Sequence, residues 1–399
     1  MFRKVNGINV ISLLLGLFPA FHLPTMQLML VIVLIGLVAS FRRLDYSAFS
    51  ELLIWRNLCF AQFYLIFFIN SCAYPVWDSP RMNYRAADLE SWSLGFLCLI
   101  VLGLWLNEQS PKLVKCALIL GLPIGLIVSF SVASFIYFSS MQGSRIQIFT
   151  PNPLGPPMWF LVLTMTSFVW FFEMSRWHKL LRILLFFMAG MMVVYASARL
   201  VSAAWIICSL ALLIWMYLNT VAEYRSRFLW AVGFIVAIFA SSIWLSGALA
   251  QSELVSRILN SVQFEWTYEN FRGQFIRLKI WSGAWSIIVD HPIFGVGKAN
   301  EHIALNQAIG WERWYKAHQT YLSYLIAGGV FTLLSGLIMQ SSVLAFIGLK
   351  NRAVFFPAFL GLGVVITLNT FTDSIFQMGS NVQFFMVATL IFLRTTEDL

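Results

Sequence analysis

Twelve apolar runs follow one another along this chain of 399 residues, and they leave little room for anything but membrane-spanning helices. A helix needs about 20 mostly apolar residues to cross a hydrocarbon core. A membrane β-barrel would instead alternate apolar and polar residues, which these continuous runs do not. We therefore predict an all-α, polytopic membrane protein with about twelve transmembrane helices. The runs cover 8–23, 24–41, 57–77, 92–107, 113–138, 157–175, 180–198, 200–219, 228–248, 319–347, 353–372 and 380–394.

The composition agrees with a single integral-membrane domain over residues 1–399. Apolar residues make up 60% of the chain and charged residues only 11%, which lies outside the range of soluble domains. No internal repeat or low-complexity tract indicates a second domain. The five cysteines, an odd number, all lie inside apolar runs, which argues against a disulfide framework and against a cysteine metal site.

Basic residues between the runs predict the orientation, because short cytoplasmic connections are enriched in Lys and Arg. With a cytoplasmic N-terminus, fifteen basic residues fall in the inner connections and four in the short outer ones. We predict that both termini are cytoplasmic. The net charge of +9 then reflects topology and anionic lipid headgroups, without a nucleic-acid partner. The inner basic residues are Arg3, Lys4, Arg42, Arg43, Arg56, Lys112, Lys115, Arg176, Lys179, Arg182, Arg225, Arg227, Lys350, Arg352 and Arg394.

This orientation places one large loop, residues 249–318, on the outer side of the membrane. Within the loop, Phe271 to Asp290 is predicted to form a helix that ends at His291-Pro292, before a turn at Gly295-Val-Gly297. An outer helix with an apolar side is expected to lie across the membrane surface or to cap the helix bundle. The predicted apolar side carries Phe275, Leu278, Trp281, Trp285 and Ile288.

Three of the arginines predicted to face the outer side are candidates for anion binding. Arg199 stands between apolar residues, where a guanidinium is costly unless it faces a cavity or an anion. Alternatively, it caps a short turn and extends to the headgroups. Arg277 on the loop helix and Arg145 in the connection 139–156 are, taken singly, equally compatible with solvated positions. Together, the three guanidiniums suit the bidentate binding of a phosphate or diphosphate.

His318 stands at the outer mouth of the tenth run, where an imidazole can act as a base near neutral pH. The alternative is that it only begins a helix. Of the preceding aromatic residues, Trp311, Trp314 and Tyr315 suit stacking on sugar faces, although such residues also form the interfacial belts of many membrane proteins. The sequence gives His302 no supporting neighbours.

Signatures of metal and nucleotide chemistry are missing from the sequence. There is no P-loop, no His-Glu-x-x-His pattern and no pair of outward carboxylates that would hold Mg²⁺ or Mn²⁺. We therefore expect no metal and no cofactor, and a mechanism that relies on arginine.

Four segments, in this order and spacing, resemble the O-antigen ligase and polymerase superfamily of Gram-negative inner membranes. The resemblance implies an inverting, metal-independent glycosyltransferase that takes a glycan from undecaprenyl diphosphate on the periplasmic side. Relatives often have Asn in place of Gln319 and Gly after the matching arginines, and some have an acid at Asp373. The segments are Arg145 to Pro153, Ser-Ala-Arg199, Ile-Arg277-Leu-Lys-Ile-Trp281 running to His291-Pro-Ile-Phe-Gly-Val-Gly297, and Ala-His318-Gln-Thr-Tyr-Leu followed by Ala327-Gly328-Gly329.

The resemblance also implies a role for each matching residue. Arg199 and Arg277, with Arg145, would hold the donor diphosphate, and His318 would activate the acceptor hydroxyl. The same comparison makes lipid A-core the acceptor, in an enzyme of the inner membrane. Supporting roles fall to Trp281, Trp314, Tyr315, Gln319 and Asp373.

Within the superfamily, the sequence favours the ligase, because the chain is compact and has one long outer loop. A polymerase, which extends the glycan on its lipid carrier, often has a second sizeable loop near 139–156. A transporter of lipid-linked sugars is the third interpretation. Transporters, however, gather functional charges near the midplane and show two related halves, which this sequence does not.

Overall fold

The structure is a computed structural model, and it describes residues 2–40, 55–74, 84–107, 109–139, 155–196, 199–226, 233, 268–310, 316–349, 352–372 and 379–395. Within these residues the chain is helical and contains no strand, which confirms the all-α class. The N-terminal half forms α1 (Phe2–Ser40), α3 (Trp55–Ala73), α4 (Tyr84–Asn107), α5 (Pro111–Ser139), α6 (Gly155–Ser167), the 3₁₀ helix η2 (Phe171–Glu173) and α7 (Arg176–Ala196). The rest forms α8 (Arg199–Asn219), η3 (Ala222–Tyr224), α12 (Tyr268–Asp290), η4 (Lys298–Asn300), α13 (Glu301–Ile309), α14 (Thr320–Leu349), α15 (Arg352–Ala358), the π-helix η5 (Phe359–Val365), α16 (Ile366–Thr372) and α17 (Gly379–Arg394).

Three of the described helices are long and apolar enough to cross a membrane, and they match the predicted runs at 113–138, 200–219 and 319–347. Five shorter apolar helices match further runs. The runs 8–23 and 24–41 both belong to the single helix α1, although Pro24 stands at the boundary between them. The run 228–248 lies almost wholly outside the described residues, so the number of twelve crossings stays a prediction. The shorter apolar helices are Gly7–Phe21, Asn57–Ala73, Trp92–Leu106, Phe355–Thr370 and Asn381–Arg394.

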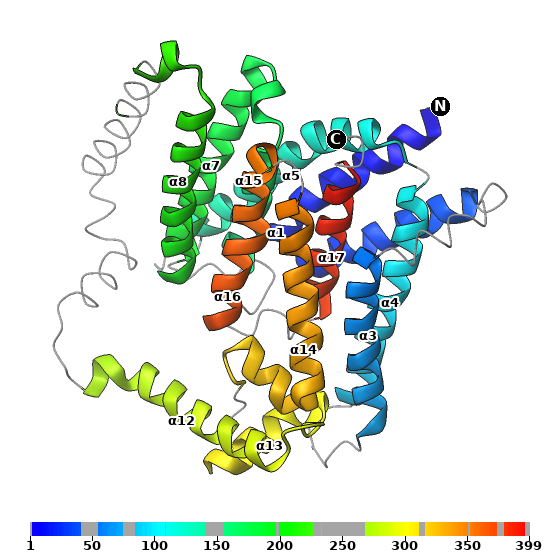
Figure 1. Cartoon of the computed structure of the whole chain (residues 1–399), viewed down its shortest axis with the longest axis vertical. Coiled ribbons are helices and arrows are strands. Elements are labelled where there is room, and N and C mark those ends of the chain that lie inside the picture. Colours follow the sequence, from blue (N-terminus) through cyan, green and yellow to red (C-terminus); the bar gives the residue numbers. More distant parts are fainter. Residues whose placement is uncertain are drawn as a thin grey trace.

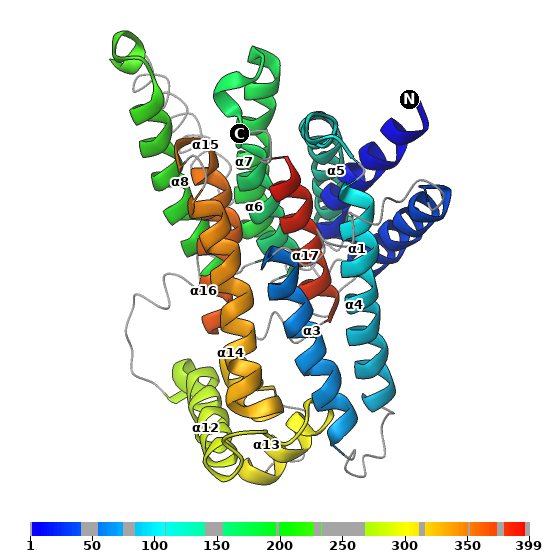
Figure 2. The same cartoon turned by 45° about the vertical axis from the view of Figure 1, so that its right-hand side comes forward.

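The apolar helices α3, α4, α14 and α17 stand roughly side by side, and α12 and α13 lie across one end of this bundle (Figures 1 and 2). Helix α1 begins, and α17 ends, at the opposite end of the bundle. The part of the long loop that the structure describes is therefore a helical cap on the side away from both chain ends.

Aromatic side chains join the upright helices. Phe18 of α1 stacks on Phe384 of α17, with ring centroids 3.7 Å apart. Trp159 of α6 packs edge-on against Phe384 and donates its indole N–H to Asn381 Oδ1 at 3.0 Å. Each indole or phenyl ring buries a large apolar area at low entropic cost, which fixes how these helices meet.

Arg182 departs from the prediction that placed it in a cytoplasmic connection. It lies inside α7 and is 0% exposed. Its Nε donates to Ser167 O at the end of α6, and its Nη2 donates to Ile119 O at 2.7 Å. Pro123 lacks an N–H, so it leaves the carbonyl of Ile119, four residues earlier, without its helical donor. Arg182 is buried because it satisfies two carbonyls that broken helices expose.

Candidate active site

Helix α12 confirms the predicted loop helix and its end at His291-Pro292, where the last helical bond runs from His291 N to Ile287 O. Its inward side carries Ile280, Ala284 and Ile287, which form a buried cluster with residues of α13 and α14. Of the predicted apolar side, Ile288 is buried and Trp281 packs against this cluster, whereas Leu278 and Trp285 are 56% and 62% exposed. The packing of α13 and α14 selects the face of α12 that is buried, and this information is not present in α12 alone.

Trp281 links α12 to the residue before His318. Its indole Nε1 donates to Ala317 O at 2.9 Å, and Ala317 is fully buried. Arg277 lies one helical turn earlier on α12, about 6 Å along the axis, and its side chain is exposed. The structure therefore brings the turn that carries Arg277 next to the segment that carries His318, although more than 35 residues separate them in sequence.

His318 has left-handed backbone geometry, with φ of 51°. Among the described non-glycine residues, only Trp170 shares a positive φ. Such geometry costs about 1–3 kcal/mol and persists only where neighbours enforce it. Here the buried Ala317 precedes His318 and the buried Thr320 follows Gln319, while the imidazole itself is half-buried. The backbone is thus fixed while the side chain keeps access to solvent.

Gln319 stands directly before α14 and caps it. Its carbonyl accepts the first helical bond, from Ser323 N, and its side-chain Oε1 accepts the N–H of Leu322. This is the pattern of a helix N-cap, a position at which Asn is among the preferred residues. Gln319 therefore makes a capping contact of the kind that Asn makes, through a longer side chain.

The turn after α12 docks into a kink in α14. Gly328 and Gly329 have non-helical dihedral angles, which interrupts the hydrogen bonding of α14. The freed carbonyls of Ile326 and Ala327 accept N–H groups from the 295–297 turn, at 2.8 and 2.9 Å, and Val330 N donates back to Pro292 O. A side chain on Gly329 would meet Ile293 backbone atoms at 2.2 Å. The two glycine motifs of the sequence resemblance are the two halves of this junction.

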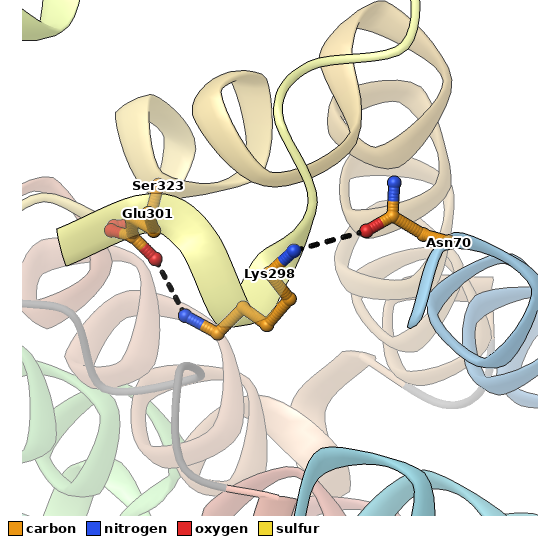
Figure 3. Close-up of polar contacts among 4 residues, drawn as sticks. All are labelled: Asn70, Lys298, Glu301 and Ser323. Carbon is orange, nitrogen blue, oxygen red and sulfur yellow. Dashed lines mark hydrogen bonds and ion pairs between the residues drawn. The ribbon is translucent and has the colours of Figure 1, made fainter. Parts of the chain in front are cut away.

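Glu301 is a buried carboxylate at this junction that the sequence interpretation did not single out. It accepts the Ser323 hydroxyl at 2.7 Å and pairs with Lys298 Nζ at 2.6 Å (Figure 3). The backbone N–H of Lys298 donates to Asn70 Oδ1 at 3.2 Å, which ties η4 to α3 (Figure 3). The network joins α3, η4, α13 and the first turns of α14 just beyond His318. The spacing of three residues between Lys298 and Glu301 was the signal in the sequence.

His302 also gains neighbours that the sequence did not reveal. Burial lowers the pKa of its imidazole below the ordinary value, and Lys298 and Lys316 lower it further, while Glu301 opposes them. The exposed side chains of Lys316 and Arg277 add positive charge to the corner around His318. Such a surface suits an anionic ligand.

The structure does not describe the side chains of the remaining predicted site residues. Arg199 is the first residue of α8, but only its backbone is described. Arg145, Asp373, Trp314 and Tyr315 lie outside the described residues, so their roles stay predictions. In the described part of the chain, no three His, Cys, Asp or Glu side chains are grouped so that they could hold a metal ion.

Residues 183–337 match the family model described as O-antigen ligase. Over these residues, the chain is similar to the O-antigen ligase family. The O-antigen ligase region begins inside α7 and ends inside α14, so it contains α8, α12, α13, His318 and the glycine junction. Its family consists of glycosyltransferase-like membrane enzymes that act on lipid-linked glycans of the O-antigen pathway. A comparison of the chain with curated proteins gave no match.

Proposed function

We propose that the protein is an O-antigen ligase. It moves O-antigen polysaccharide from undecaprenyl diphosphate to a sugar hydroxyl of lipid A-core, at the periplasmic face of the inner membrane. The family match and the twelve apolar runs support this assignment. The observation that carries it is the bond between Trp281 and Ala317, because it joins the helix of Arg277 to the segment of His318.

The proposed step is a direct displacement with inversion. His318 takes the proton of the acceptor hydroxyl as its oxygen bonds to the anomeric carbon, and the bond from that carbon to the diphosphate breaks. Arg277, Arg199 and Arg145 stabilise the negative charge that develops on the departing diphosphate, which guanidiniums do without a metal. Trp314 and Tyr315 stack on the sugars, Asp373 supports the site, and the fixed backbone of His318 keeps the base in place.

Deletion of the gene, followed by gel analysis of lipopolysaccharide, separates the three candidate functions. If the deleted gene encodes a ligase, the core lacks attached polymer and lipid-linked polymer accumulates. If it encodes a polymerase, the core carries a single repeat unit. If it encodes a transporter, the carrier-linked substrate is lost from the periplasm.

A histidine pair tests the base. His318→Ala should lower the transfer rate about 10²- to 10⁴-fold while the protein remains in the membrane. His291→Ala is the matched control, because His291 is an exposed loop histidine on the same side of the molecule. Full activity of the His318 variant in a complemented deletion strain would remove the catalytic role.

Arg277 is tested by charge-retaining and charge-removing variants. Arg277→Ala should raise the apparent KM for the lipid-linked donor more than Arg277→Lys, because Lys retains the charge but loses the bidentate geometry. Equal, near-normal rates for both variants would refute a role in diphosphate binding.

A further inference from the structure

One side of α12 exposes a stripe of large apolar residues. Leu278, Trp285 and Val289 are 56%, 62% and 61% exposed. Because successive helical residues turn by about 100°, these three fall within an arc of about 40°. Ile293 and Phe294, just after the helix, continue the surface and are 50% and 62% exposed. We call these five residues the α12 stripe.

The other sides of α12 have different partners. Ile280, Ala284 and Ile287, on the opposite side, are buried against α13 and α14. Lys279 and Asp290 are exposed about 100° around the helix from the stripe. Helix α12 therefore has a protein-facing side, a polar side and an apolar side, which is the arrangement of a helix that lies in a membrane interface.

The α12 stripe is continuous with the apolar surface of a membrane-spanning helix. The ring of Phe294 lies 5.7 Å from that of Phe331 on α14. Phe331 is itself 50% exposed and belongs to the segment Thr320–Phe346, which is long and apolar enough to cross a membrane. In a membrane, the exposed side of that segment faces lipid. The stripe extends this lipid-facing surface around the end of the bundle, where α12 lies crosswise (Figures 1 and 2).

We propose that the α12 stripe is seated in the lipid leaflet on that side of the membrane, so that α12 is an interfacial helix anchored by Trp285. The stripe contacts the lipid at the boundary between the acyl chains and the headgroups. Trp is well suited to this boundary, because its ring is apolar and its N–H is polar.

The anchoring of α12 sets the position of the active site relative to the lipid headgroups, which rests on the proposed function. Arg277 directly precedes Leu278 of the stripe, so its guanidinium lies at headgroup level. The diphosphate of a polyprenyl-linked donor lies at the same level, because its isoprenoid chain is held in the hydrocarbon. Because α12 lies in the interface, Arg277 can contact the diphosphate of the donor while the isoprenoid chain of the donor stays in the membrane.

Spin labels test the membrane contact without any measurement of activity. Single cysteines are introduced at Leu278, Trp285 and Val289, and at the polar-side controls Lys279 and Asp290, in the full chain with its five native cysteines replaced. The labelled protein is placed in vesicles of phosphatidylethanolamine and phosphatidylglycerol, and collisions with oxygen and with a water-soluble nickel chelate are compared. Oxygen should dominate at the three stripe positions and nickel at the two controls.

Two results would overturn the membrane contact. Nickel-dominated collisions at the stripe positions would mean that the stripe faces water. Low collision rates with both reagents would mean that another protein surface covers it.

Two substitutions that each introduce a negative charge test whether the membrane contact of the stripe affects glycan transfer. Trp285→Glu should lower transfer from the lipid-linked donor at least tenfold through a higher apparent KM, whereas Ser286→Glu, on the exposed side next to the stripe, should change it less than twofold. Equal effects of the two variants would refute the link to donor presentation. If the labels report lipid contact but the wild-type protein transfers no glycan, the proposed function fails and the membrane contact stands.

Discussion

In both the corner around His318 and the core around Arg182, a broken helix leaves backbone carbonyls without their helical donors. The two regions supply these carbonyls with donors in different ways. Each contains a broken helix and a non-glycine residue with positive φ, His318 in one and Trp170 in the other. In the core, the fully buried Arg182 satisfies the free carbonyls of Ser167 and Ile119. In the corner, backbone N–H groups of the 295–297 turn satisfy the carbonyls that the kink in α14 frees.

The difference lies in what remains accessible. Trp170 is 4% exposed, and Lys115, which lies 5.0 Å from its ring, is paired with Glu173. Around His318, main-chain bonds close the break, so the cationic side chains of Arg277 and Lys316 stay exposed. Left-handed backbone geometry therefore does not identify a catalytic residue by itself. We propose His318 as the base because this geometry there combines with an accessible side chain and a charged surface.

The largest expected effect is on folding and comes from Arg182. Arg182→Gln should destabilise the protein by about 3–5 kcal/mol, since it removes a buried charge whose bonds satisfy two carbonyls. Arg176→Gln, an exposed arginine on the same helix, should leave stability within about 0.5 kcal/mol. Thermal unfolding in lipid nanodiscs measures both variants. Similar unfolding temperatures would show that the two carbonyls do not need Arg182.

The junction in α14 should give the next largest effect. Gly329→Ala should cost about 2 kcal/mol or more, because the residue has φ of 63° and the new methyl group would meet Ile293. Gly310→Ala is a matched control, since φ is 68° but no atom lies within 4 Å. Unfolding and transfer assays on both variants separate strain from collision. A loss in Gly310→Ala as large as that in Gly329→Ala would show that docking of the turn contributes nothing.

Trp281 should have a smaller effect that acts mainly on catalysis. Trp281→Phe retains an aromatic ring but removes the donor to Ala317 O, which is worth about 1 kcal/mol. We expect kcat to fall about fivefold, with KM for the donor nearly unchanged. Trp177→Phe is the control, since Trp177 is 81% exposed on α7. A change in KM alone would indicate that Trp281 contacts the donor instead of positioning His318.

The sequence predicted those features that depend on local signals. Helix α12 and its end followed from apolar spacing and from His291-Pro292, and the order of the motifs indicated the family. The burial of Arg182 was missed because it depends on Pro123 and Ser167, which lie on other helices. The sequence also did not separate the buried Ile288 from the exposed Trp285, since α13 and α14 select the buried side of α12. The sequence named His318 and Trp281 as candidate site residues, but it did not predict that the Trp281 indole contacts Ala317, the residue before His318.

Gln319 should give the smallest effect, and it separates capping from chemistry within the corner. Gln319→Asn should keep transfer within about twofold, because Asn is a preferred N-cap. Gln319→Ala should lower stability by about 1 kcal/mol, because it leaves the N–H of Leu322 without its cap. Unfolding temperature and transfer rate should therefore change together across the two variants. If Gln319→Asn were fully stable but inactive, the side-chain amide would contact substrate, and the cap alone would not account for its place beside His318.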